Sequence, residues 1–148
     1  MGRVQAGRVQ AGPGLAARGR VVLARDGSVA ARRDLADSLV ATGIPHLGKA
    51  KEHPRFRQEL SAVMAKVGNV RRLGAAAIDL AYVAAGRYDA YWERGLQSWD
   101  MAAGIVLVRE AGGFVTDLAG GSDPLARGDI LVGNETMVRG LSDLLRPA

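Results

Sequence analysis

The segment SWDMAAGIVLVREAGG, residues 98–113, constrains the fold of this chain more than any other stretch. Met101, Ile105 and Val108 recur at helical spacing, and the two closing glycines allow the left-handed turn that commonly ends a helix. We therefore expect a helix over residues 100–111. Because only two side chains beyond its first turn are charged, we expect this helix to lie between other layers of the fold.

Asp100 stands at the expected start of this apolar helix. Unbonded backbone N–H groups and the helix dipole favour an anion at that place. The spacing alone leaves two interpretations open: Asp100 caps the helix, or it is held rigidly enough to bind a hard cation. We expect Trp99 to pack beside Asp100 and to orient it.

The rest of the chain after residue 29 alternates helical and extended patterns. An alternation of this kind predicts an α/β fold, a layered sandwich of sheet and helices. Gly86 is expected to cap one helix at its end, and Asn134 to cap another at its start. The expected helices cover residues 54–68, 74–86 and 135–145, and the expected strands cover residues 38–42, 87–93, 114–118 and 129–134.

The first part of the chain has a different character. Residues 2–12 repeat a five-residue unit, GRVQA, and have no periodicity that could bury a face. We predict a flexible leader over residues 1–28, with residues 21–24 compatible with an added strand, and one domain over residues 29–148.

The basic charge of the chain is concentrated in this leader. Residues 1–33 carry a net charge of +6, whereas residues 34–148 carry −1. A basic face on the fold itself is therefore not expected, and neither is nucleic-acid binding. The chain has no cysteine, no apolar run near the roughly 20 residues of a membrane span, and no signal-peptide pattern. We expect a cytoplasmic protein without a membrane partner.

Three stretches together resemble the inositol monophosphatase family of magnesium-dependent phosphatases. WDMAAGIVLVREAGG resembles its C-terminal signature, VRRLGAAAIDLAYVAAGRYDAYWERGLQSWD its substrate-side segment, and DILVGN its last strand. The resemblance covers residues 29–148. It implies the C-terminal half of a sugar-phosphatase type of sheet-and-helix sandwich, with Mg2+ as cofactor and a sugar or inositol phosphate as substrate.

The resemblance also implies roles for single residues. Asp100 would be a magnesium ligand, and Glu93, seven positions earlier, would contact the hydroxyls of the substrate. The backbone at Gly74, Ala75 and Ala76 would approach the substrate ring, where small side chains leave room. From the residues alone, Glu93 is also compatible with a solvated strand end, and the Gly-Ala-Ala run with tight helix packing. We assign no general acid or base.

Other acidic residues receive structural interpretations. Asp79 lies inside an apolar helix, where we expect a hydrogen-bonded structural role. Asp117, Asp123 and Asp129 are expected in turns or at strand ends.

The chain departs from the family pattern in one respect. It has no Asp-Pro-hydrophobic-Asp-Gly-Thr loop, which supplies further magnesium carboxylates in that family. Magnesium prefers about six oxygen ligands, so we expect weak binding and little hydrolysis by this chain alone. Two hypotheses follow. The first is an inositol-phosphate phosphatase that works as a homodimer or paired with another chain. The second is a non-catalytic half-fold that survives as an interaction module or as a gene remnant.

Overall fold

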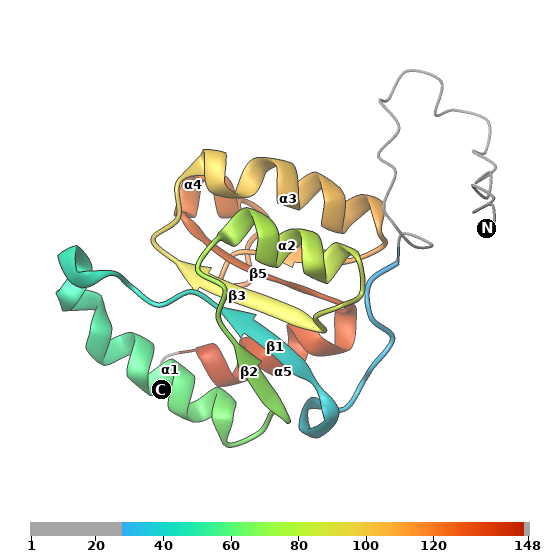
Figure 1. Ribbon diagram of the computed structural model, residues 1–148, viewed down its shortest axis with the longest axis horizontal. Helices are drawn as coiled ribbons and strands as arrows, with labels where there is room; N and C mark the ends of the chain where they lie inside the picture. Colours follow the sequence, from blue (N-terminus) through green and yellow to red (C-terminus); the bar gives the residue numbers. More distant parts are fainter. Residues whose placement is uncertain (1–27, 147–148) are drawn as a thin grey trace, which may run out of the picture.

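The computed structural model describes residues 28–146, which form one mixed five-stranded sheet with helices on both faces (Figure 1). The predicted α/β sandwich is confirmed. The predicted leader up to residue 27, and the strand considered at residues 21–24, lie outside the described residues.

The sheet has the strand order β2-β1-β3-β5-β4. Strand β1 pairs in parallel with both β2 and β3, whereas β5 is antiparallel to β3 and to β4. Parallel strands end at the same edge of a sheet, so the residues that follow β1 and β3 lie side by side. The strands are β1 (Leu39–Thr42), β2 (Asn69–Arg71), β3 (Ala90–Arg94), β4 (Phe114–Thr116) and β5 (Asp129–Gly133).

Two helices cover each face of this sheet: α2 and α3 lie on one side, α1 and α5 on the other (Figure 1). The sequence predicted α1, α2, α3, α5 and one helical turn before β1, but missed the other short helices and the edge strand β2. The helices are α1 (His53–Met64), α2 (Ala76–Ala84), α3 (Ser98–Glu110), α4 (Pro124–Arg127) and α5 (Glu135–Leu145), with 3-10 turns η1 (Leu35–Asp37) and η2 (Leu47–Glu52).

Alternation along β3 divides the core into two clusters. Tyr91 is fully buried among α2 and α3, while its neighbour Trp92 is buried among α1 and α5. Successive side chains of a strand point to opposite faces, so the central strand contributes one large aromatic ring to each layer.

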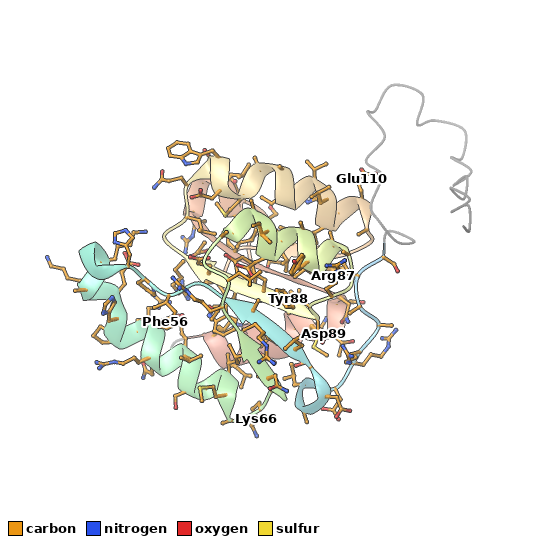
Figure 2. The ribbon with its side chains drawn as sticks, in the orientation of Figure 1. Phe56, Lys66, Arg87, Tyr88, Asp89 and Glu110 are labelled. Atoms are coloured by element: carbon orange, nitrogen blue, oxygen red, sulfur yellow. The ribbon has the colours of Figure 1, made fainter. Side chains whose placement is uncertain are left out.

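Polar side chains fix the helix ends and the strand register. The Asn134 side chain accepts a hydrogen bond from Met137 N at 3.0 Å, which confirms the predicted cap of α5. Gly86 follows α2 with φ of +66°, as expected for a helix end. Asp89, which is fully buried beside the start of β1 (Figure 2), accepts from Leu39 N at 2.7 Å and from the Arg32 guanidinium at 3.0 Å.

Helix α3 differs from its prediction because only one of its faces is covered. Met101 and Val108 are fully buried, but Trp99 is 76% exposed and Val106 is 50% exposed. A helix turns about 100° per residue, so Trp99 lies about 200° from Met101 and faces outward. The expectation that α3 lies between layers is therefore wrong for the described residues. Trp99, which we expected to pack beside Asp100 and orient it, instead has most of its surface exposed.

The described helices are short. No helix in residues 28–146 is long and apolar enough to cross a lipid bilayer.

Candidate functional site

The candidate site begins where β1 and β3 end at the same edge of the sheet. Thr42 of β1 pairs with Trp92 of β3, so the next residues, Gly43 and Glu93, lie beside each other. The Glu93 carboxylate fills the space that a Cβ at position 43 would occupy. Only glycine at this position allows so close an approach.

Glu93 is held in place and is not a freely solvated strand end. Its side chain is half-buried and accepts a hydrogen bond from the Tyr91 hydroxyl, two residues earlier on the same face of β3. Burial raises the pKa of Glu93, with a further rise from the nearby Asp100 carboxylate, against the lowering effects of Tyr91, Lys49 and Arg72. Glu93 thus presents a carboxylate with a raised proton affinity.

Tyr91 is the fixed donor of this pair. Burial raises the pKa of Tyr91 well above its usual range, and the neighbouring carboxylate of Glu93 raises it further. The phenol therefore stays neutral at ordinary pH and donates a hydrogen bond to Glu93. The aromatic alternation over residues 87–93 predicts Tyr91 and Glu93 on one face, but it gives no sign that Tyr91 holds Glu93 by a hydrogen bond.

Asp100 acts as a helix cap and reaches the same site. It is the third residue of α3, and its Oδ2 accepts a hydrogen bond from Gln97 N at 2.9 Å. The capping interpretation is confirmed. Among the described residues the second carboxylate oxygen of Asp100 makes no hydrogen bond, and its charge raises the pKa of both Glu93 and Tyr91.

Asp79 is the third acidic group here, and we call Glu93, Asp100 and Asp79 the acidic cluster. The prediction that Asp79 is hydrogen-bonded is wrong. Its side chain is fully buried, and within residues 28–146 neither carboxylate oxygen has a hydrogen-bond partner. Burial raises the pKa of Asp79 to about 6, and repulsion by Glu93 contributes. The Ala75 backbone N–H, which lies near the carboxylate but outside hydrogen-bonding geometry, and Arg72 both lower the pKa of Asp79 without cancelling the effect of burial.

The Gly-Ala-Ala segment forms the turn into α2. Gly74 has φ of +83°, a left-handed conformation that favours glycine, and the Arg72 guanidinium lies against it. Ala75 is half-buried, and Ala76, the first residue of α2, is buried. The turn lies near the acidic cluster, because Ala75 and Arg72 both act on the pKa of Asp79.

Two cationic side chains, which no sequence motif indicated, border this acidic cluster. Lys49 of η2 donates to the carbonyl of Gly95 just after β3, and Arg72 follows β2. Both lower the pKa of Glu93. No local pattern marks either one, because their approach to Glu93 depends on the path of two loops.

Asp117 and Asp129 lie in a turn and at a strand end, as predicted, whereas Asp123 lies at the start of a helix. The side chain of Asp117 accepts from two N–H groups of its own turn, and that of Asp123 caps α4. Asp129 begins β5 and pairs with Arg94 at 3.1 Å.

The described residues do not by themselves fit a magnesium ion. Within residues 28–146 no group of three or more acidic or histidine side chains is arranged to hold a metal. Asp100 has one carboxylate oxygen to offer, whereas magnesium takes about six oxygen ligands. We therefore derive no metal-dependent step for this part of the chain.

Glu93 near the carboxyl end of β3, the end of the parallel strand β1 and the start of α3 with Asp100 therefore meet at one edge of the α/β sandwich, the edge where ligands commonly bind in folds of this class. A model of the inositol monophosphatase family matches residues 14–146, and the chain belongs to this family. This confirms the resemblance seen in the sequence.

Individual relatives share about half their length with the chain. It is 56% identical over 113 residues to an inositol-1-monophosphatase of Mesorhizobium japonicum, covering 76% of this chain and 42% of that protein. It is 40% identical over 131 residues to the Nus factor SuhB of Pseudomonas aeruginosa, and this match covers 88% of this chain and 48% of that protein. The part matched is the C-terminal portion of these relatives.

Solved structures have the same fold. The extragenic suppressor protein suhB from Bartonella henselae superposes with a TM-score of 0.80 at 52% identity, over 84% of this chain and 47% of that one. The inositol monophosphatase from Anabaena superposes with a TM-score of 0.75 at 37% identity, over 82% of this chain and 50% of that one. The sandwich of the described residues is therefore about half of a larger fold in these proteins.

Proposed function

We propose that this chain takes part in the magnesium-dependent hydrolysis of a phosphomonoester of inositol or a related sugar alcohol. The observation that carries the proposal is the convergence of Glu93, its donor Tyr91 and Asp100 at one edge of the sheet. Glu93 accepts hydrogen bonds from substrate hydroxyls, and the turn at Gly74 and Ala75 leaves room for the ring, with Ala76 behind it.

Within this proposal the chain supplies only part of a magnesium site. Asp100 is one ligand, and the others come from a partner, which is a second copy of this chain or another polypeptide. The half-length coverage of the relatives supports this arrangement. The cytoplasmic location expected from the sequence is part of the same proposal.

The test compares the chain alone with the chain supplemented by the missing portion. Inositol 1-phosphate and magnesium are incubated with residues 1–148, with and without the N-terminal portion of the Mesorhizobium relative that lies outside the match. We expect phosphate release only in the mixture. Asp100→Asn should abolish it and Glu93→Gln should raise KM, whereas Asp143→Asn on the exposed surface of α5 should change nothing.

Two results would contradict the proposal. Phosphate release that is equal in the parent chain and Asp100→Asn would remove Asp100 from the site. A mixture that binds but stays inactive would favour the second candidate function.

That second candidate is a non-catalytic interaction module, and the outer face of α3 supports it. Trp99, Ala102, Ala103 and Val106 are all exposed and recur at helical spacing, so they form an apolar stripe. Ile78 of α2 is 49% exposed. Exposed apolar stripes mark docking surfaces, and the occupant that we propose is a polypeptide equivalent to the unmatched half of the relatives.

Trp99 reports on this docking directly. In a Trp92→Phe variant it is the single tryptophan of the chain, and binding should shift its fluorescence to shorter wavelength. Val106→Asp should prevent the shift, and Arg109→Asp, an exposed charge on the same helix, serves as the control for a change of charge. A shift that survives Val106→Asp would place the docking surface elsewhere.

A further inference from the structure

Two glycines at the candidate site make room for charged side chains of opposite sign. At Gly43, directly after β1, the place of a Cβ is occupied by the Glu93 carboxylate. At Gly95, directly after β3, the corresponding place is occupied by the ammonium group of Lys49, which lies on the turn η2. Gly95 also has φ of +71°, a left-handed conformation that favours glycine. The backbone after β3 therefore allows Lys49 to approach the strand end closely.

A hydrogen bond keeps Lys49 at this strand end. Its Nζ atom donates to the carbonyl oxygen of Gly95, two residues after Glu93. Because η2 follows β1 in the chain, this bond connects the loop after β1 to the end of the neighbouring strand β3. Lys49 thus fixes the backbone that continues from Glu93 and places a positive charge beside it.

The turn that carries Lys49 is itself held by two histidines. His46 Nδ1 accepts from Gly48 N at 3.1 Å and caps the start of η2. His53, directly after η2, is bonded through Nε2 to the carbonyl oxygen of Pro45 at 2.9 Å. Since this oxygen can only accept, Nε2 carries the proton. Lys49 therefore extends from a turn that is tied at both ends.

Glu93 lies among acidic neighbours, so a fixed cation matters there. Burial raises the pKa of Glu93 most, because it removes water that would stabilise the ionised carboxylate. Of the two cations that lower this pKa, Lys49 has the larger effect, and Arg72 the smaller. The charged and titratable groups around Glu93 come from η2, the residue after β2, α2, β3 and α3; they are Lys49, Arg72, Asp79, Tyr91 and Asp100.

We propose that Lys49 is a positioning residue for Glu93. It holds the end of β3 through the Gly95 carbonyl, and it supplies the fixed positive charge with which the half-buried Glu93 remains an ionised hydrogen-bond acceptor. The consequence for ligand binding rests on the proposed function, whereas the effect on Glu93 itself applies to the chain alone. Because Lys49 acts through Glu93, its loss should weaken ligand binding and leave the chemical step unchanged.

The first test measures the ionisation of Glu93 by NMR in the full chain without magnesium. The carboxyl carbon signal, assigned by its loss in Glu93→Gln, is followed against pH at about 0.15 M salt, where distant surface charges are screened. Lys49→Met should raise the pKa of Glu93, because a nearby positive charge is removed. Lys49→Arg keeps a charge and a donor and should restore the parent value. Lys51→Met, exposed on the same turn, is the matched control and should change nothing.

The second test measures catalysis in the mixture with the N-terminal portion of the Mesorhizobium relative. With inositol 1-phosphate and magnesium, Lys49→Met should raise KM about fivefold and leave kcat unchanged. Lys49→Arg should restore KM, and Lys51→Met should behave like the parent chain. If no mixture releases phosphate, the proposed hydrolysis fails, while the NMR measurement still decides whether Lys49 acts on Glu93.

Circular dichroism checks that each variant is folded. If Lys49→Met is not, Lys49→Gln replaces it, because glutamine keeps a donor for the Gly95 carbonyl and removes only the charge. It should raise the pKa of Glu93 in the same direction.

Three results would overturn the inference. A pKa of Glu93 that is unchanged in the folded variant lacking the charge would show that Lys49 does not act on Glu93. An equal shift in Lys51→Met would indicate a general effect of surface charge and not of one placed cation. A kcat that falls while KM stays constant in Lys49→Met would assign Lys49 to the chemical step.

Discussion

Asp79→Asn should stabilise the fold at neutral pH, because the native carboxylate is buried without a partner. The pKa of Asp79 is about 6 in the fold against an ordinary value of 3.8. The folded state therefore binds the proton more tightly than the unfolded state does. The free energy that proton binding at Asp79 contributes to folding is fully present below about pH 4 and falls as the pH rises to about 6. Above that pH it no longer changes. A difference of about two pKa units corresponds to about 3 kcal/mol.

Urea unfolding between pH 4 and about pH 8, followed by circular dichroism, measures this effect. The informative quantity is the difference in unfolding free energy between Asp79→Asn and the parent chain. It should be near zero at pH 4 and rise to about 3 kcal/mol in favour of the variant above pH 6. Asp143→Asn on the exposed face of α5 should show no such trend. A difference that is independent of pH would refute the reasoning.

Three further substitutions test other parts of the structure. Asp89→Ala leaves the buried N–H of Leu39 without its acceptor and should lower the unfolding free energy by about 2 to 3 kcal/mol in urea titrations. Asn134→Ala removes the cap of α5 and should lower the melting temperature through a loss of about 1 kcal/mol. Gly43→Ala introduces a Cβ where the Glu93 carboxylate lies; it should move that group toward solvent and lower its pKa in an NMR titration, and an unchanged titration would contradict the geometry.

Much of the fold could be predicted from the sequence because its strongest signals are local. The apolar spacing of α3, the glycine after α2 and the cap of α5 each depend on neighbours within a few residues. The edge strand β2 was missed because its three residues carry no apolar alternation and gain their conformation from pairing with β1. Tertiary pairing commonly overrides such weak local preferences.

The site was predicted only in part, for a related reason. Glu93 and Asp100 were identified through a motif, and the structure brings both to the edge where Tyr91 also lies. We expected Trp99 to pack beside Asp100 and orient it, whereas its side chain faces outward. Its position on the helix wheel, two residues before Met101, already places it on the opposite face.

The side chains that each face of the sheet presents depend on the register of a single strand. Asp89, directly before β3, binds the N–H of Leu39 at the start of β1 and so fixes which residues of the two strands are paired. A slip by one residue would exchange the two faces of β3: Tyr91 would leave the acidic cluster and Trp92 would enter it. A buried carboxylate at the far end of the strand thus determines which chemistry each face of the sheet presents.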